Sequence, residues 1–229
     1  MAEILVELLE IAEREMKCCV EIEFAANMDR GERLAIFNVL QVRPIAEGAS
    51  GAAIDWSKID TSNALIYSES ALGTGAVNDV CGVVYLREEN FNPASTERIA
   101  EEVTRLNAKM REEGRGYVLV GFGRWGSSNP WLGVPVKWSD ISEAKVIVEC
   151  GLDNFRIEPS QGTHFFQNLT SCGSAYLTVD SYDEEECFNE DFLETLEVVE
   201  ENKYLKWVRS STPLVAKVDG KKRRAIILK

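Results

Sequence analysis

Short apolar segments bounded by turn residues constrain the fold of this chain more than any other feature of its sequence. Five of them have the length and the β-branched or aromatic content of buried strands. They are Ala64–Tyr67, Gly82–Leu86, Tyr117–Val120, Ala144–Glu149 and Ala175–Val179. A helical pattern runs from Pro93 to Glu113 and stops at Gly114, a residue type that commonly ends helices. Strands and helices mixed in this way predict an α/β fold.

The first part of the chain carries a different pattern. Residues 3–17 repeat apolar side chains at helical spacing and predict an amphipathic helix. Val20–Phe24 alternates strictly between apolar and polar residues, and Leu34–Arg43 returns after a polar turn, so we expect two strands of a hairpin. Pro44 ends the second strand, because proline cannot donate to a strand ladder. Residues 46–60 are rich in Ala, Gly and Ser and predict a linker.

The last part of the chain, residues 182–229, is interpreted as an extension. It begins with the acidic run Asp183–Glu186, and a helix is predicted near Phe188–Glu200. Leu214–Val218 and Arg223–Leu228 then predict a hairpin that turns at an Asp-Gly pair.

Composition narrows the class of function. Asp and Glu number 38 against 25 Lys and Arg, which gives a formal net charge of −13. A surface this negative repels nucleic-acid phosphates and anionic lipids, so we expect no nucleic-acid or membrane partner. No apolar run approaches the ~20 residues that span a bilayer, and the N-terminus lacks the basic-then-apolar pattern of a signal peptide. We therefore expect a cytoplasmic protein.

The cysteines give no sign of a metal or disulfide framework. The chain has six of them, none in a C-x-x-C pair, and a single histidine. A structural zinc site needs closely spaced Cys and His ligands, and a chain of this length needs no disulfides to fold. We expect small buried thiols.

Four polar side chains are predicted to share one face of the N-terminal hairpin. Alternate residues of a strand point to the same side, so Glu21 lies beside Glu23, and Gln41 beside Arg43. Paired strands would then join two carboxylates, which suit Mg²⁺ together with phosphate oxygens, to an arginine that binds phosphate through two donors. The alternative is an ordinary solvated face of an amphipathic hairpin.

The segments V-E-I-E-F and L-Q-V-R-P-I resemble the end of the ATP-grasp nucleotide-binding domain in the phosphoenolpyruvate synthase and pyruvate phosphate dikinase family. The resemblance implies that Glu23 is a metal ligand and that Gln41 and Arg43 face the phosphates of ATP. Glu21 occupies a position that is also acidic in the family. The likeness covers residues 1–45, so most of the nucleotide pocket belongs to an upstream ATP-grasp domain. This chain alone is not expected to bind ATP well or to be active.

A glycine-rich loop, Gly121–Gly126, matches the pattern G-x-G-x-x-G. A dinucleotide site also needs a helix that opens at the loop, whereas Ser127–Gly133 is rich in turn residues, so we do not expect a Rossmann site. The loop could still hold a phosphate with Arg124. The alternative is that Trp125 and Trp131 pack the loop onto the domain.

His164 is the candidate nucleophile. It follows Gly162-Thr163, and residues 163–172 predict a helix with Gly173 just past its end. In the first turn of that helix the dipole favours a neutral imidazole, and free backbone N–H groups would stabilise a phosphoryl group carried on the ring. The alternative is a structural or surface histidine.

The order of segments around His164 resembles the mobile, swivelling phosphohistidine domain that follows the ATP-grasp domain in the same family. The matching segments are Ala71–Ala76, Val118–Val120, Asn129–Trp131, Val146–Val148, Gly162–His164 and Cys172–Gly173. The step from His164 to Gly173 also matches. Two segments before His164 are longer than in the family, and Phe165 and Phe166 replace small residues.

The resemblance thus implies a mixed α/β chain in four parts. These are the C-terminal end of an ATP-grasp domain (1–45), a linker (46–60), a swivelling β/β/α-like phosphohistidine domain (61–181) and a helix–hairpin extension (182–229). The implied function is phosphoryl transfer within a larger enzyme. ATP bound with Mg²⁺ would phosphorylate His164, and the swivelling domain would carry the phosphate to pyruvate, forming phosphoenolpyruvate, or to a related acceptor. The alternative is a non-catalytic binding or scaffolding module that keeps the swivelling fold without the phosphohistidine.

Overall fold

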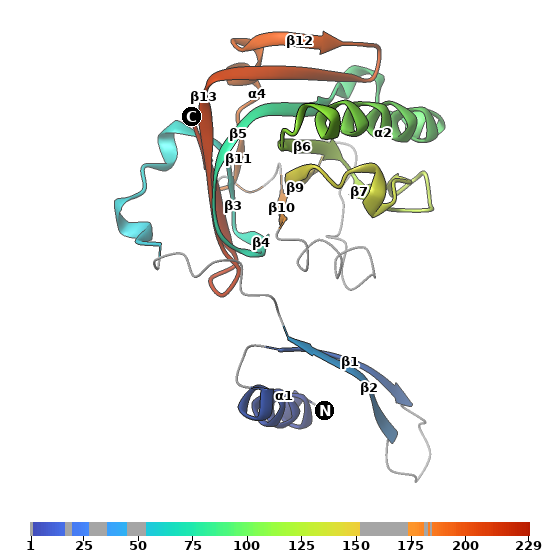
Figure 1. Ribbon diagram of the computed structural model, residues 1–229, viewed down its shortest axis with the longest axis vertical. Helices are drawn as coiled ribbons and strands as arrows, with labels where there is room; N and C mark the ends of the chain where they lie inside the picture. Colours follow the sequence, from blue (N-terminus) through green and yellow to red (C-terminus); the bar gives the residue numbers. More distant parts are fainter. Residues whose placement is uncertain are drawn as a thin grey trace. The chain divides into compact units, whose positions relative to one another are not determined.

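The computed structural model describes residues 2–16, 20–27, 36–44, 54–151, 174–180, 183 and 185–229. The chain divides into two compact units, Met1–Glu47 and Gly48–Lys229. The first unit contains helix α1 (Ala2–Met16) and the antiparallel strands β1 (Val20–Asn27) and β2 (Ile36–Pro44), drawn in blue in Figure 1. The predicted helix and hairpin are confirmed.

The second unit is built on one sheet. Its ten strands run in the order β11-β3-β14-β13-β5-β6-β9-β10-β4, with β12 beside β13. Their bounds are β3 (Ala64–Ser68), β4 (Ser70–Leu72), β5 (Thr74–Leu86), β6 (Tyr117–Phe122), β9 (Ala144–Cys150), β10 (Ala175–Val179), β11 (Cys187–Phe188), β12 (Glu197–Glu201), β13 (Leu205–Asp219) and β14 (Arg224–Leu228). Strands β5, β6, β9 and β10 are parallel neighbours, and the remaining pairs are antiparallel.

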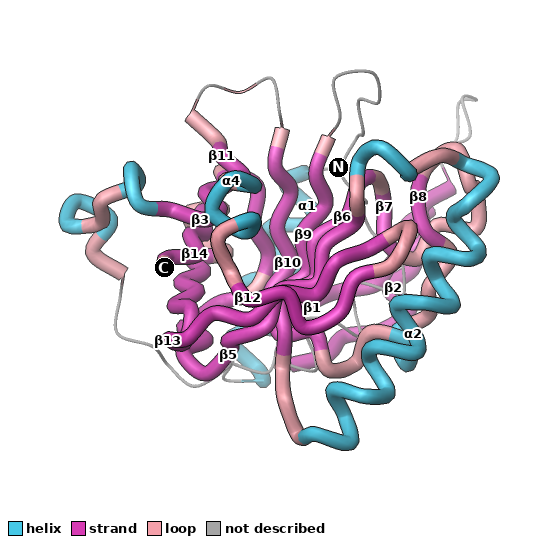
Figure 2. The backbone as a smooth tube through the Cα atoms, turned by 90° about the horizontal axis from the view of Figure 1, so that it is seen from above, coloured by secondary structure: helices cyan, strands magenta, loops and turns pink. Residues whose placement is uncertain are grey.

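The sheet curls upon itself (Figure 2). Only Glu69 separates β3 from β4, yet these two strands stand near opposite ends of the strand order. The Ser68 hydroxyl at the end of β3 donates to the carbonyl of Thr178 in β10 at 2.5 Å, and the Ala71 N–H of β4 donates to the carbonyl of Arg223 at 3.0 Å. These contacts join the two sides of the curled sheet. The second unit is mixed α/β and consists mostly of strands.

Helix α2 (Thr96–Glu113) connects β5 to β6 and buries the apolar face expected from its sequence. Ile99, Val103, Leu106 and Met110 are at most 1 % exposed. The helix ends at Gly114, whose φ of 63° is left-handed and whose N–H donates to the carbonyls of the last turn, as predicted. Among the described helices none is both long and apolar enough to cross a membrane.

Smaller elements complete the second unit. Strands β7 (Arg124–Trp125) and β8 (Gly133–Val134) form a separate parallel pair. Short 3₁₀ turns lie at Trp56–Lys58, Thr61–Asn63, Glu88–Asn90, Pro93–Ser95 and Trp138–Asp140, the first of them within the predicted linker. The short helix α4 (Glu190–Glu194) begins after Asn189, whose side chain accepts from the Phe192 N–H at 2.9 Å.

The predicted strands are confirmed in β3, β6, β9 and β10, but two predictions need correction. The predicted strand Gly82–Leu86 is the second half of β5, which begins at Thr74. The helix expected over Phe188–Glu200 is present only as α4, because Phe188 belongs to β11 and Val198, in β12, pairs with Val208 of β13. β-Branched side chains fit a strand better than a helix. The predicted helix over 163–172 lies outside the described residues.

Residues 182–229 are not an extension. The predicted hairpin is present as β13 and β14, but β13 also pairs with β5, and β14 with β3. Trp207 and Ile226 from this part are at most 1 % exposed in the core. The expected boundary after residue 181 therefore runs through a single sheet.

Candidate functional site

The β1–β2 hairpin brings together four of the residues singled out in the sequence. Its register sets Glu21 opposite Arg43 and Glu23 opposite Gln41. Since alternate residues share a face, all four side chains lie on one side of the hairpin. Arg43 donates from Nη2 to Gln41 Oε1 at 2.8 Å, and its Nε lies 4.0 Å from Glu21 Oε1. The predicted pairing of the two strands is confirmed.

This arrangement fits a metal–phosphate ligand. The side chains of Glu21 and Arg43 are 34 % and 37 % exposed, so a ligand can approach both from solvent. An ion pair of this length on a surface contributes little to stability. In the described parts of the chain no group of three or more His, Cys, Asp or Glu is arranged to hold a metal ion. Mg²⁺ at Glu21 and Glu23 would therefore take its other ligands from water and phosphate oxygens, as it commonly does.

The glycine-rich loop leads from β6 into β7, so the helix that a Rossmann site needs does not follow it. Its backbone N–H groups are used within the domain. Gly123 donates to the Cys150 carbonyl at 3.3 Å, Arg124 to that of Leu132 at 2.8 Å, and Gly126 to that of Val134 at 2.9 Å. The backbone N–H groups of Gly123, Arg124 and Gly126 are therefore engaged within the domain and not directed at a phosphate.

Trp125 and Glu149 fasten the loop to the sheet. Trp125 is 2 % exposed, whereas Trp131 is 68 % exposed, so only the first of the two tryptophans packs the loop. The Trp125 N–H donates to Glu149 Oε1 at 2.8 Å, and the Tyr176 hydroxyl donates to Glu149 Oε2 at 2.5 Å. A buried carboxylate needs such donors. Glu149, which the sequence did not single out, thus connects β7, β9 and β10.

His164, the predicted phosphate carrier, lies outside the described residues. The strands on either side of it in the sequence are described: β9 ends at Cys150, and its parallel neighbour β10 begins at Ala175.

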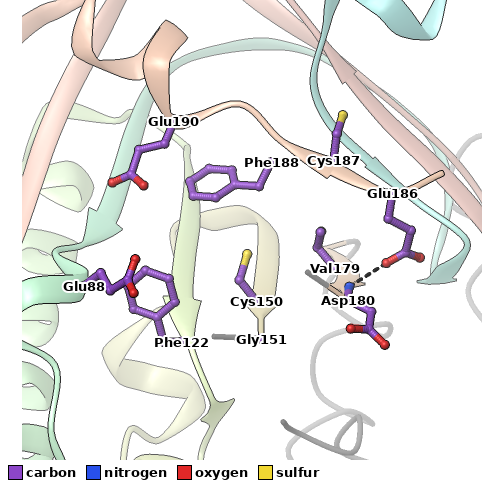
Figure 3. Close-up of a pocket in the computed structure, with 10 residues that line it drawn as sticks. All are labelled: Glu88, Phe122, Cys150, Gly151, Val179, Asp180, Glu186, Cys187, Phe188 and Glu190. Atoms are coloured by element: carbon purple, nitrogen blue, oxygen red, sulfur yellow. Dashed lines mark hydrogen bonds between the residues drawn. The ribbon is translucent and has the colours of Figure 1, made fainter. Parts of the chain in front are cut away.

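A second candidate site is a pocket of about 380 Å³ where the parallel strands end (Figure 3). Phe122, Cys150 and Val179 are the last residues of β6, β9 and β10, and Glu88 follows β5 closely. In open α/β sheets this carboxyl edge is the usual place for ligands. We call this site the acidic pocket; the described residues that line it are Glu88, Phe122, Cys150, Gly151, Val179, Asp180, Glu186, Cys187, Phe188 and Glu190.

The carboxylates of the acidic pocket form two groups. Figure 3 shows Glu88 and Glu190 at one end and Glu186 with Asp180 at the other. Burial raises the pKa of Glu190, and repulsion from Glu88 adds to the rise. Burial also raises the pKa of Glu186, and repulsion from Asp183 and Asp180 acts in the same direction. The backbone N–H groups of Glu69 and Asp180, which donate to the two Glu186 oxygens at 2.6 Å, act against this rise.

Cys150 lies between these two groups. Its thiol is free, the residue is 4 % exposed, and Figure 3 shows the sulfur directed into the pocket. Burial raises the pKa of this thiol, and the charges of Glu149, Glu186 and Glu190 raise it further. A thiol in such surroundings is neutral and a poor nucleophile.

The other cysteines agree in part with the expected buried thiols. Cys81 and Cys187 are also free, and they are half-buried rather than buried. Cys18, Cys19 and Cys172 lie outside the described residues.

The two sites differ in the charge of the ligand that they can hold. The hairpin combines carboxylates with a guanidinium, whereas the acidic pocket presents four carboxylates and therefore repels phosphate. Comparison with known protein families, with curated proteins and with solved structures finds no match. The chemistry of both sites thus rests on their own residues.

Proposed function

We propose that this chain carries part of a phosphotransferase of the phosphoenolpyruvate synthase and pyruvate phosphate dikinase kind. In this proposal phosphate moves from ATP through His164 to pyruvate or a related acceptor. The observation that supports it is the cross-strand set of the hairpin, in which Glu21 faces Arg43 and Glu23 faces Gln41. Carboxylates beside a guanidinium are what a magnesium-bound phosphate requires.

Each residue of the hairpin has a role in this proposal. Glu23, with Glu21 beside it, binds the Mg²⁺ that neutralises phosphate oxygens. Arg43 donates two N–H groups to a phosphate, which a lysine in its place does not do. Gln41 accepts from Arg43 Nη2 at 2.8 Å and so fixes the plane of the guanidinium. Positioning and charge neutralisation of this kind account for most of the catalysis of phosphoryl transfer.

The second unit supplies the carrier in this proposal. Strands β6, β9 and β10 are consecutive parallel neighbours, and they follow one another in the chain as the segments of a swivelling phosphohistidine domain do. This order supports a β/β/α-like carrier around residues 61–181, with the strands of the C-terminal part added to its sheet. Arg124, next to the end of β6, is the proposed phosphate contact of the carrier.

The decisive experiment is phosphate labelling of the proposed larger enzyme, in which this chain is continuous with a complete nucleotide-binding domain. After incubation with ATP and Mg²⁺, we expect one acid-labile, base-stable phosphate on His164, detected by intact mass at alkaline pH. The variant His164→Ala should carry none. A label that persists in His164→Ala, or no label in the wild type, contradicts the proposal and favours the non-catalytic module.

A second pair of variants tests the hairpin. Arg43→Lys should lower the rate of labelling about tenfold or more, since a point charge replaces a two-donor fork. Arg14→Lys is the matched control, because Arg14 lies on the exposed surface of α1. Equal rates in the two variants would return the hairpin to an ordinary solvated surface.

A further inference from the structure

We propose that the acidic pocket binds a linear aliphatic polyamine, with one terminal ammonium between Glu88 and Glu190 and the other at Glu186. This site does not depend on the proposed phosphoryl transfer.

The arrangement of charged and apolar groups in the pocket carries the proposal. Carboxylates occupy both ends, and Phe122, Val179 and Phe188 supply apolar surface to the lining between them (Figure 3). A linear polyamine has the same sequence of properties, since its charged nitrogens are separated by methylene groups. Ammonium groups also bind favourably near the faces of aromatic rings.

Cys150 is the second observation that points to a ligand. The residue is 4 % exposed, and its sulfur faces the pocket. No described residue forms a hydrogen bond with its thiol. A thiol is a weak donor and acceptor. Because Cys150 lies between the two carboxylate groups, its sulfur faces the place where an inner N–H of a polyamine would lie.

The electrostatics of the acidic pocket favour a cation. Glu186 and Glu190 are half-buried, so they have lost part of their hydration, and each is repelled by neighbouring carboxylates. Two of these neighbours, Glu88 beside Glu190 and Asp180 beside Glu186, line the same space. A bound cation replaces the lost hydration and relieves the repulsion.

Other ligand classes fit less well. Phosphate is repelled by the four carboxylates. Within the described ranges no group of three or more His, Cys, Asp or Glu is arranged to hold a metal ion through protein ligands alone. The separation of the carboxylates into two groups suits two charged nitrogens better than one small ion.

The test is calorimetric titration of the full 229-residue chain with spermidine, with butylamine as the single-charge comparison. We expect spermidine to bind at least about tenfold more tightly than butylamine, which corresponds to about 1.4 kcal/mol. Glu190→Gln and Glu186→Gln should each weaken spermidine binding about tenfold. Glu112→Gln is the matched control: it removes the same charge from the exposed surface of α2 and should leave the affinity unchanged.

Several outcomes would overturn the proposal. They are no binding of spermidine, equal affinities for spermidine and butylamine, and equal losses in Glu112→Gln and Glu190→Gln, which would show only attraction to a negative surface. Displacement of spermidine by Mg²⁺ at a lower concentration would make the pocket a metal site. The Glu186 variant keeps one amide oxygen, which can accept from only one of the N–H groups of Glu69 and Asp180. The Glu190 variant tests the opposite end of the pocket independently.

Discussion

The two compact units bury their apolar residues to very different extents. In the second unit the central residues of the strands are fully buried: Leu119 in β6 and Ile147 in β9 are 0 % exposed. In the described part of the first unit only Val20 is buried, while Ile36 and Leu40 are 61 % and 59 % exposed. One unit has a core of its own, and the other has secondary structure with little core beneath it.

The difference shows that local pattern and burial are separate sources of order. Alternation and helical spacing are enough to define α1, β1 and β2, but a two-stranded hairpin is only marginally stable without further surface to pack against. Its contacts within the unit include the stacked rings of Phe24 and Phe37, 4.5 Å apart. The exposed apolar residues of the hairpin include Phe24, Ile36, Val39 and Leu40. Exposed apolar patches are typical of interaction sites. This exposure agrees with the proposal that a nucleotide-binding domain completes the first unit.

The largest expected effect separates the two cores. Leu119→Ala should lower the free energy of unfolding by about 2–5 kcal/mol, because it leaves a cavity in a closely packed interior. Leu9→Ala, in α1, should cost less than about 1 kcal/mol, since Leu9 is 36 % exposed. Urea unfolding of both variants measures the difference. Similar losses would mean that the first unit has a core after all.

The next effect compares the ion pairs of the two units. Lys206 is 8 % exposed, and its Nζ lies 2.6 Å from Glu194 Oε2, while the Tyr85 hydroxyl donates to the other oxygen at 2.6 Å. Lys206→Met should cost about 1–2 kcal/mol at neutral pH, the usual range for a charge-assisted hydrogen bond. Arg43→Met removes the 4.0 Å pair with Glu21 and the exposed hydrogen bond to Gln41, and it should cost less than about 0.5 kcal/mol.

The pH dependence of the Lys206 variant gives a second measurement. The hydrogen bonds from Lys206 and Tyr85 lower the pKa of Glu194. A carboxyl whose folded-state pKa is lowered contributes stability above its unfolded pKa, about 4.3, and loses it as the pH falls through the folded value. The difference between wild type and Lys206→Met should therefore shrink below about pH 4.3. A difference that stays constant down to pH 2 or so would show that packing, not charge, is responsible.

The sequence predicts those parts of the fold that local pattern determines. The apolar runs of β6, β9 and β10 and the capped helix α2 are recognisable because each carries its own signal. The first half of β5 carries Gly75, Asn78 and Asp79, which strands disfavour, and it is ordered by pairing with the distant β13. The prediction that residues 182–229 form an extension fails for the same reason. Partners distant in the sequence, not local propensity, place β13 and β14 in the middle of the sheet.

The candidate sites follow the same rule. The polar face of the hairpin was predictable, because alternation within two neighbouring strands is enough to gather Glu21, Glu23 and Arg43. The acidic pocket was not, because it takes residues from the ends of four parallel strands and from a segment after residue 185. A usable signal existed in the carboxylates that follow strands, Glu88 after β5 and Asp180 after β10.

The smallest expected effect concerns Glu190 in the acidic pocket. Burial and the charge of Glu88 raise its pKa in the folded state. A raised pKa means that stability is greatest below the unfolded pKa of about 4.3 and is lost as the pH rises through the folded value. Glu190→Gln removes this loss, so the variant should be more stable than wild type by a few tenths of a kcal/mol at neutral pH, and no more stable near pH 4. Glu10→Gln, on the exposed side of α1, is the matched control in the first unit and should show no such gain. Urea unfolding from pH 4 to pH 8 measures both variants, and a gain of the same size in Glu10→Gln would assign it to the net charge of −13 rather than to the pocket.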